Sequence, residues 1–515
     1  MNGAPTGDPN RTLITVSIML ATVMNSLDTT IANVALPHMM GSVSASADEI
    51  TWVLTSYIVA AAILTPLTGW LAGRLGRKTL FMISIAGFTF ASALCGAAQN
   101  LPQIVIFRLL QGAFGACLIP LSQAVLLDIY PLEEQGPAMA IWGMGTLLGP
   151  IIGPTLGGWL TDNLSWRWVF YINLPLGALA FLGVMTFIHD HKSHEKVPFD
   201  FMGFGFLSLA IGSFQLFLDR GQDKAWFEST EIWIEATIAG LALFLFAVHS
   251  ATAKRPFVPP ELIANRNFMA ATIFGFFLGL LLYSTLALLP PMLETLMGYP
   301  VTTTGLVSLP RGVGSFIAMF FVGRIVNRVD ARAIIVFGLS LSLISAWGMT
   351  SFALGMDAHI VIWTSFVQGL GTGFIFIPLT TLGFATIDPK FRPDASGVFT
   401  LARNLGSSAG ISIMQALLTQ NAAMVHARLT EGLTPDNLNY QSMTSDYSAA
   451  GSAFSLTNPA GAAAINGVVN QQATMVAYID DFKLMMITTM ALAPLLFFMR
   501  PPSRTLADSG SLVLE

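Results

Sequence analysis

Long apolar segments separated by mostly short polar connections constrain this chain more than any other feature of its sequence. Each segment holds roughly 18 to 25 residues, the length that a helix needs to cross the hydrocarbon core of a bilayer. Only 10% of the 515 residues are charged, whereas an average soluble protein carries about 25%. The chain is therefore predicted to be an all-α polytopic membrane protein. The fourteen predicted spans are 13–37, 50–72, 79–98, 102–126, 138–161, 168–188, 200–218, 232–250, 268–292, 304–325, 333–353, 359–384, 396–419 and 481–499.

The basic residues of the connections predict how the chain is oriented. Of the 24 Lys and Arg residues, sixteen lie in connections on one side of the predicted spans, five lie on the other side, and three lie inside spans. Connections on the cytoplasmic side of a membrane protein carry the excess of Lys and Arg. Both termini are therefore expected in the cytoplasm.

Several other classes of protein do not fit this sequence. The net charge of −5 is small and spread over loops, so no nucleic-acid partner is expected. The sequence contains no P-loop signature, and we expect neither an enzyme nor a cofactor. His189, His191, His194 and Glu195 have the spacing of metal ligands, but a solvated loop is the favoured interpretation and no metal site is expected.

Asp28 is the only ionisable residue in the span 13–37. It lies about 15 residues into its helix, hence ~22 Å from the inner end at about 1.5 Å per residue. A carboxyl group at that depth is costly and is found mainly where protons, ions or substrate move. Asp28 therefore points to transport. A fixed hydrogen bond to a neighbouring helix is the structural alternative.

The chain contains an internal duplication. The segment 69–78, GWLAGRLGRK, matches 323–332, GRIVNRVDAR, and 111–122, QGAFGACLIPLS, resembles 368–380, QGLGTGFIFIPLT. The matches occur in one order and at nearly one offset, which is 254 residues for the first and 257 for the second. The first six and last six helices are therefore predicted to be related halves. Transporters built from such repeats bind substrate near the midplane, between the halves.

The duplication divides the chain into three parts. Residues 1–195 form the N-terminal six-helix half, residues 196–262 form two inserted linker helices, and residues 263–515 form the C-terminal six-helix half. The C-terminal half contains a long outer loop at 420–480 that is rich in small polar residues. So long a connection is uncommon unless it has a task such as docking a partner. A disordered excursion is the alternative.

The ordered set of motifs in this chain resembles the major facilitator superfamily. Its loop signature is GWLAGRLGRK, with Gly69, Gly73, Arg74, Gly76, Arg77 and Lys78; Gly73 stands where the family usually has an aspartate. RLLQGAFGA at 108–116 resembles the signature of the fourth helix. The antiporter signature of the fifth helix, GMGTLLGPIIGPTLGG, contains Gly145, Gly149, Pro150, Gly153, Pro154, Gly157 and Gly158.

Other motifs resemble a narrower group within the superfamily. LDTTIANVALP at 27–37 and WRWVFYINLPLG at 166–177 are similar to segments of the fourteen-helix drug:proton antiporters. LDRGQDKAWF at 218–227 and HARLTEGLTPDN at 426–437 resemble EmrB-type exporters. The resemblance implies a major facilitator fold with helices arranged as 6+2+6. It also implies proton-driven export across a bacterial inner membrane, with a periplasmic membrane-fusion adaptor and an outer-membrane channel as partners.

Asp28 and Arg108 are the proton-coupling candidates, because the resemblance places the first and fourth helices beside one cavity. Arginine does not deprotonate usefully, so Arg108 would adjust the behaviour of Asp28 or hold an anion; a static ion pair is the alternative. The glycines of the antiporter signature recur every four residues from Gly145 to Gly157. They form one smooth helix face, which is interpreted either as an interface between the halves or as ordinary tight packing.

The substrate-cavity candidates are Arg311, Arg403, Glu294, Asn33 and Gln111. The two arginines could pair with acids such as Glu294 or attract an anionic substrate. Since the spans carry extra arginines and few acids, neutral or weakly acidic lipophilic drugs are the expected substrates. A dedicated exporter of one metabolite, such as a fatty acid or siderophore, is one alternative. A non-transporting membrane scaffold or receptor is another.

Overall fold

The computed structural model describes residues 10–131, 134–188, 198–326, 328–433 and 459–499. All regular structure in these ranges is helical, and they contain no strand. A helix satisfies every backbone hydrogen bond within its own segment, which the interior of a bilayer requires. The prediction of an all-α membrane protein is confirmed.

The N-terminal half begins with α1 (Arg11–Val43), whose outer end is followed by the short α2 (Ala47–Ile50). Its other elements follow the predicted spans, several of which are interrupted by a brief change of helix geometry. They are α3 (Trp52–Leu64), η1 (Thr65–Leu67), α4 (Thr68–Leu75), α5 (Arg77–Ala97), α6 (Leu101–Gly115), α7 (Leu118–Ile129), α8 (Gln135–Asn163), α9 (Trp168–Tyr171) and α10 (Asn173–Phe187).

Two inserted helices, α11 (Phe201–Gly221) and α12 (Thr230–Thr252), precede the C-terminal half, with η3 (Trp226–Glu228) between them. Helix α11 packs against α12, against α3 of the first half and against α18 of the second. The C-terminal half consists of α13 (Pro260–Ala264), α14 (Arg266–Pro291), η4 (Met292–Leu296), α15 (Val301–Ile325), α16 (Ala331–Met349), α17 (Ala358–Phe384), η5 (Pro389–Phe391), α18 (Arg392–Glu431), α20 (Pro459–Leu492) and η6 (Ala493–Phe498).

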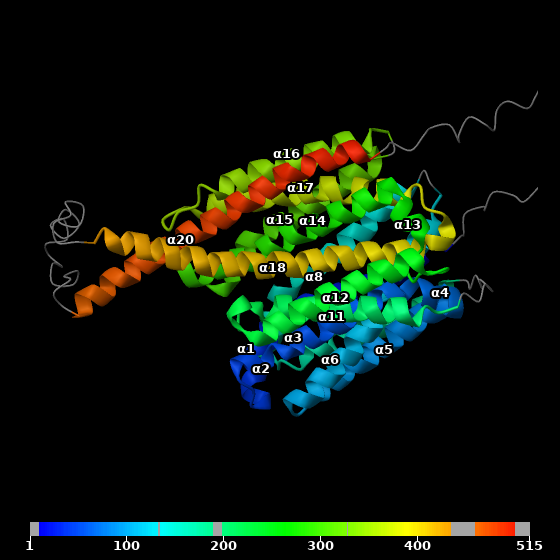
Figure 1. Cartoon of the computed structure of the whole chain (residues 1–515), viewed down its shortest axis with the longest axis horizontal. Coiled ribbons are helices and arrows are strands. Elements are labelled where there is room, and N and C mark those ends of the chain that lie inside the picture. The colour runs from blue at the N-terminus through cyan, green and yellow to red at the C-terminus, as the bar shows by residue number, and fades with distance from the viewer. Residues whose placement is uncertain (1–9, 132–133, 189–197, 327, 434–458, 500–515) are drawn as a thin grey trace, which may run out of the picture.

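The two halves lie side by side with their helices along the long axis of the molecule (Figure 1). Within the described ranges, thirteen helical segments are long and apolar enough to cross a membrane. The predicted span 396–419 falls in α18, which is longer but more polar than the rest and is not among the thirteen. The count of fourteen spans therefore stays a prediction.

The segment 420–480 is not a loop throughout, and this part of the sequence-based division is corrected. Helix α18 continues to Glu431 and α20 begins at Pro459, so only residues 434–458 lie outside the described structure. At about 1.5 Å per residue, the 40 residues of α18 span ~60 Å, twice the roughly 30 Å hydrocarbon core. The ends of α18 and α20 project together beyond the bundle (Figure 1), and His426 Nε2 lies 2.8 Å from Asn466 Oδ1 between them.

Candidate functional site

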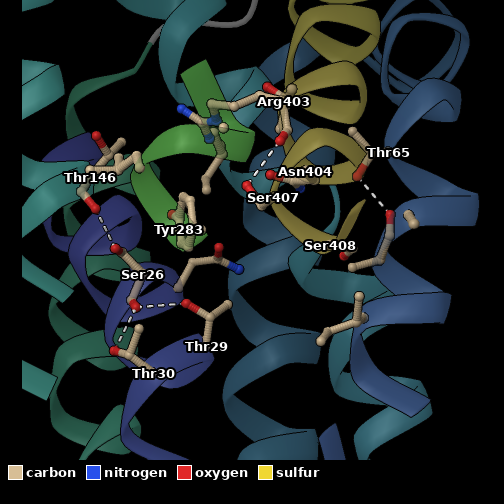
Figure 2. A pocket seen from close by; sticks show the side chains of 18 of the residues that line it. Ser26, Thr29, Thr30, Thr65, Thr146, Tyr283, Arg403, Asn404, Ser407 and Ser408 are labelled. Carbon is tan, nitrogen blue, oxygen red and sulfur yellow. Dashed lines mark hydrogen bonds between the residues drawn. The ribbon is translucent and has the colours of Figure 1, made fainter. Parts of the chain in front are cut away.

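A cavity of about 260 Å³ lies between the two halves. Its wall combines apolar side chains with hydroxyl and amide groups, and Figure 2 shows Ser26, Thr29 and Thr30 of α1 together with Tyr283 of α14 and Arg403 and Asn404 of α18. Gln215 of the inserted helix α11 also lines it. No Asp or Glu is present among the described residues of the wall, whereas Arg108 and Arg403 both belong to it.

The cavity is open toward one end of the molecule. Thr29 and Asn33 line it and are exposed, and both lie in the part of α1 that leads to its end at Val43. Asn33 therefore lies where it was predicted, on the wall of the cavity.

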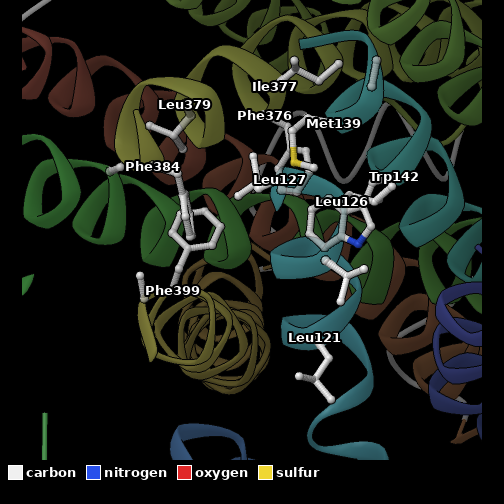
Figure 3. Packing of buried hydrophobic residues seen from close by; sticks show 14 of the residues in the cluster. Leu121, Leu126, Leu127, Met139, Trp142, Phe376, Ile377, Leu379, Phe384 and Phe399 are labelled. Carbon is white, nitrogen blue, oxygen red and sulfur yellow. The ribbon is translucent and has the colours of Figure 1, made fainter. Parts of the chain in front are cut away.

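The opposite end of the cavity is closed by a cluster of apolar side chains from both halves (Figure 3). Trp142 of α8 stacks on Phe376 of α17, with ring centroids 5.9 Å apart and planes 13° from parallel. Leu126 of α7 and Phe399 of α18 belong to the same buried cluster. Because these residues come from different halves, the halves must separate here before the cavity can open at this end.

Polar contacts reinforce the closed end. Arg392 Nη1 of α18 lies 3.0 Å from Asp128 Oδ1 of α7, and Ser396 Oγ donates to Gln123 Oε1 over 2.5 Å. Asp128 also forms an ion pair with Arg77, whose Nη2 donates to the Pro389 carbonyl over 3.2 Å. These contacts join the loop signature to the other half. Sequence reasoning missed Asp128 and Arg392, because each lies at the end of a span with no local pattern to mark it.

Glycines in the loop signature allow a tight turn and close packing against the other half. Gly76 has φ +86°, a left-handed conformation that only glycine adopts without strain, and it turns the chain from α4 into α5. A Cβ on Gly69 would collide with the carboxylate of Asp394, whereas a Cβ on Gly73 would meet open space. Lys78 Nζ donates to the Met185 carbonyl over 2.7 Å, and the Arg74 guanidinium lies 5.3 Å from the centre of the Trp70 ring.

Asp28 is fully buried in the N-terminal half, behind the cavity wall. Three donors from two other helices converge on its carboxylate. Arg108 Nη1 donates to Oδ2 over 2.6 Å, while Gln111 Nε2 and Asn173 Nδ2 donate to Oδ1 over 2.7 and 2.9 Å. Such donors offset the cost of burying a charge.

Arg108 connects Asp28 with the cavity. Its Nε donates to the Val53 carbonyl over 3.0 Å and its Nη1 donates to Gln111 Oε1 over 2.9 Å. The guanidinium lies 4.2 Å from the centre of the Tyr57 ring, within cation–π range. Arg108 is 1% exposed but belongs to the cavity wall, as Tyr57 does.

The spacing of α6 explains this geometry, since Arg108 and Gln111 lie three residues apart on one helix face. The structure brings Gln111 to Asp28 and not to the cavity wall, which corrects its prediction as a substrate-cavity residue. Asn173 was missed as a site residue. It lies inside WRWVFYINLPLG and inside the predicted span 168–188, where an amide in an apolar run was the available signal.

The glycines of the antiporter signature face α1 of the same half. A Cβ on Gly149 would collide with the backbone of Ser26, and one on Gly153 would collide with Thr30 Oγ1. The close approach allows Ser26 Oγ to donate to the Thr146 carbonyl over 2.5 Å. The interpretation of this face as an interface between the halves is therefore wrong. Helix α8 meets α15 of the other half through a different face, where Ile151 packs beside Gly312.

The two C-terminal arginines occupy different places. Arg403 of α18 lines the cavity and lies 5.8 Å from the centre of the Phe376 ring. Arg311 of α15 is 6% exposed and is not part of the cavity wall. Neither forms an ion pair with a described acid, and Glu294 in η4 lies outside the wall. The structure thus contradicts Arg311 and Glu294 as cavity residues and rejects their suggested pairing.

No group of three or more potential metal ligands occurs in the part of the chain that the structure describes. The cluster of His189, His191, His194 and Glu195 lies in 189–197, outside the described residues.

Residues 18–411 match the family model of the Major Facilitator Superfamily. The chain is 35% identical to the Multidrug export protein EmrB of Escherichia coli K12 over 95% of both chains. It is also 35% identical to the Fatty acid resistance protein FarB of Neisseria gonorrhoeae, over 95% of this chain and 96% of FarB. The human organic anion transporter MFSD10 (TETRAN) matches with a TM-score of 0.57 and 13% identity, covering 93% of this chain and all of that one, which supports the fold alone.

Proposed function

This chain belongs to the major facilitator superfamily, and we propose that it is a proton-driven antiporter that exports lipophilic, neutral or weakly acidic drugs. It is a multi-pass membrane protein and a multidrug efflux transporter, not an enzyme. The main support for proton coupling is the Asp28 carboxylate, which is fully buried and whose partner Arg108 lines the cavity.

Protonation of Asp28 would change the shape of the cavity. A neutral carboxyl loses the charge that attracts Arg108 and also loses acceptor capacity toward Gln111 and Asn173. Asp28 lies on α1 between Asn25 and Thr29, both of which line the cavity. Loosening the carboxylate from α6 and α10 therefore shifts a wall of the binding site. In the proposed cycle a proton enters from the open outer side, and its binding releases the drug outward.

The charge of the wall supports the substrate class. Apolar side chains such as Leu278, Met319 and Ile411 would hold a lipophilic body, while Arg403 offers a cation that no described acid neutralises. A cavity without carboxylates does not favour organic cations. Neutral molecules and weak acids are therefore the proposed drugs.

A dedicated exporter of one metabolite is the second candidate. The relative named for fatty acid resistance is as similar to this chain as the multidrug relative is, and a fatty acid combines a carboxylate with a long apolar chain. A transport assay over a panel of unrelated lipophilic compounds separates the two functions, because a dedicated exporter would move only one class.

We further propose that the chain is the inner-membrane subunit of a tripartite pump in a bacterium with two membranes, with both termini cytoplasmic. The projecting ends of α18 and α20 are the proposed docking site for a periplasmic adaptor, which would connect to an outer-membrane channel. Their length beyond a bilayer and the exposed Met424, Leu429 and Val468 support this assignment.

Drug-driven proton movement in proteoliposomes tests the proposal. Adding a lipophilic acid on the cytoplasmic side should make the purified wild-type protein move protons against the drug, as reported by a pH-sensitive dye. The same proteoliposomes with Asp28→Asn protein serve as the matched control. Absence of proton movement with every drug that binds would favour a scaffold or receptor over an antiporter.

A further inference from the structure

Two adjacent aspartates on α20 have opposite environments. The Asp480 side chain is 38% exposed and pairs with Lys483, with 2.9 Å between Oδ1 and Nζ. Asp481 is 0% exposed, and neither of its carboxylate oxygens has a hydrogen-bond partner among the described residues. Asp481 is therefore a second fully buried acid besides Asp28, and the sequence alone did not distinguish it from the neighbouring Asp480.

Helical spacing places Asp481 on the core-facing side of α20. Ala477 and Tyr478 precede it by one turn and Met485 follows it by one turn, and all three are buried. They belong to an apolar cluster that also contains Met414 and Leu418 of α18 and Leu293 of η4. The carboxyl group therefore lies in apolar surroundings.

Among the described residues, no cation forms an ion pair with Asp481. The nearby titratable groups on its own helix are Tyr478, Asp480 and Lys483; Lys483 is the one cation of the three, and it pairs with Asp480. The elements packed against α20 are α14, α16, α18, η4 and η6. Among the described residues, none of the titratable groups that these elements carry away from the closed inner end forms an ion pair or hydrogen bond with Asp481. They are Tyr283, Glu294, Arg403, His426, Arg428 and Glu431.

An unpaired carboxylate in such a place is unfavourable, and the group avoids this by holding a proton. A second, small cavity lies beside the transport site; two neighbours of Asp481 on α20 line it, although Asp481 itself does not. Phe482 and Met485 line this cavity of about 30 Å³, which shares Leu278, Leu282 and Thr372 with the central cavity. That volume is about the share of one water molecule in the liquid, and Thr285 and Gln368 supply polar groups to its wall.

We infer that Asp481 is a second proton-binding site, located in the C-terminal half and distinct from the Asp28 site. The carboxyl group binds a proton while α20 is packed as observed. It releases the proton when the packing of α14, α16 and α20 changes during transport and admits water through the small cavity. This inference rests on the proposed antiport, because only a transport cycle would give the buried group alternating access to water.

Dicyclohexylcarbodiimide tests the inference on the wild-type protein, because this apolar reagent modifies protonated carboxyl groups in apolar surroundings. The full-length protein in liposomes would be treated over a series of pH values, and the labelled peptides would be quantified by mass spectrometry. Asp481 is expected to be labelled at least tenfold more than Asp480, and its labelling should fall as the pH rises. Absence of label on Asp481, or labelling that does not change with pH, would overturn the inference.

Counting protons supplies the second measurement. Asp481→Asn keeps the shape of a protonated aspartate and should lower the number of protons moved per drug molecule by one, whereas Asp480→Asn should leave the number unchanged. Equal ratios in both variants and the wild type would contradict a second proton site. If the wild type moves no protons at all, the proposed antiport fails, while the pH-dependent labelling still decides whether Asp481 exchanges a proton.

Discussion

Arg108 Nη1 donates to Asp28 Oδ2 over 2.6 Å, yet only Arg108 reaches the wall of the central cavity. The carboxylate that would carry the proton is thus separated from the drug by one guanidinium. Both groups are buried, at 0% and 1% exposure. A change in the charge of Asp28 therefore acts on the cavity through Arg108 as well as through α1, whose Asn25 and Thr29 also line the wall.

Replacing Asp28 with Asn should abolish proton-coupled export while the protein still inserts into the membrane. Asn cannot bind or release a proton, and the amide leaves the Arg108 charge without an acid partner. Losing one partner of a buried pair costs about 3–5 kcal/mol, so lower thermal stability is also expected. Drug-driven proton flux would be compared in proteoliposomes, with Asp28→Asn/Arg108→Gln as a control that removes both charges. Equal flux in wild-type and Asp28→Asn protein would refute the role of Asp28.

Replacing Arg108 with Lys should reduce export at least tenfold. A lysine ammonium cannot donate to the Val53 carbonyl and to Asp28 at the same time in the geometry of the planar guanidinium. Each lost charged hydrogen bond is worth about 1.5–3 kcal/mol. Transport rates would be measured at equal protein amounts, with Arg108→Ala as the expected inactive reference. Wild-type rates in the lysine variant would mean that only the positive charge matters.

Gly149→Ala should impair export, whereas Gly158→Ala on the same helix should not. A Cβ at Gly149 collides with the Ser26 backbone, while the nearest atom to a Cβ at Gly158 is Val34 Cγ1 at an ordinary 3.9 Å. Overpacking of this kind costs about 1–3 kcal/mol. It would also displace α1 next to Asp28. Thermal stability and proton-coupled transport report on the two variants. Normal coupling in Gly149→Ala protein would show that the contact between α1 and α8 tolerates displacement.

Arg403→Gln should weaken export of acidic drugs more than export of neutral drugs of similar size. Arg403 is the cation that the C-terminal half contributes to the cavity wall, and no described acid pairs with it. A charged hydrogen bond worth about 1.5–3 kcal/mol corresponds to at least tenfold in apparent affinity. Arg311→Gln is the matched control, because Arg311 lies outside the wall. An equal loss for acidic and neutral drugs would argue against a carboxylate contact.

The sequence predicted the helical architecture because a membrane-spanning helix needs a long run of apolar residues. Such a run is recognised even when the exact first and last residues of the helix are not. It also predicted that Asp28 and Arg108 belong together, because the family resemblance places the first and fourth helices beside one cavity. The pairing of Gln111 with Asp28 was missed, although its spacing from Arg108 was visible. The repeat of glycines every four residues could not show which helix Gly149 faces, because a smooth helix face can pack closely against any neighbouring helix.

Residues that join distant parts of the chain were the least predictable. Asp128 and Arg392 are 264 positions apart and meet only after both halves have assembled. Arg311 and Glu294 were suggested as partners, but Glu294 lies in η4 and forms no ion pair with Arg311, whose Nε and Nη2 have no hydrogen-bond partner among the described residues. The difference between Asp480 and Asp481 likewise depends on which face of α20 meets α18, which composition does not determine.

Shortening the projecting ends of α18 and α20 should separate transport from pump assembly. The contact between His426 and Asn466 marks where the two helices can be joined. Replacing residues 427–465 with a short Gly-Ser turn keeps that contact and every residue of the cavity wall. Proton-coupled transport in liposomes should therefore stay within about twofold of wild type, since a plain connection between helices needs only a few residues.

In cells the same variant should lose most of its drug resistance and recover less adaptor on co-purification, because the proposed docking surface has been removed. A replacement confined to 434–458 is the matched control, as it keeps both helical ends. If the control loses adaptor as strongly as the longer replacement does, the adaptor binds 434–458 and not the helices. Unchanged resistance and adaptor recovery in both variants would show that docking occurs elsewhere, for example on the connection between α11 and α12.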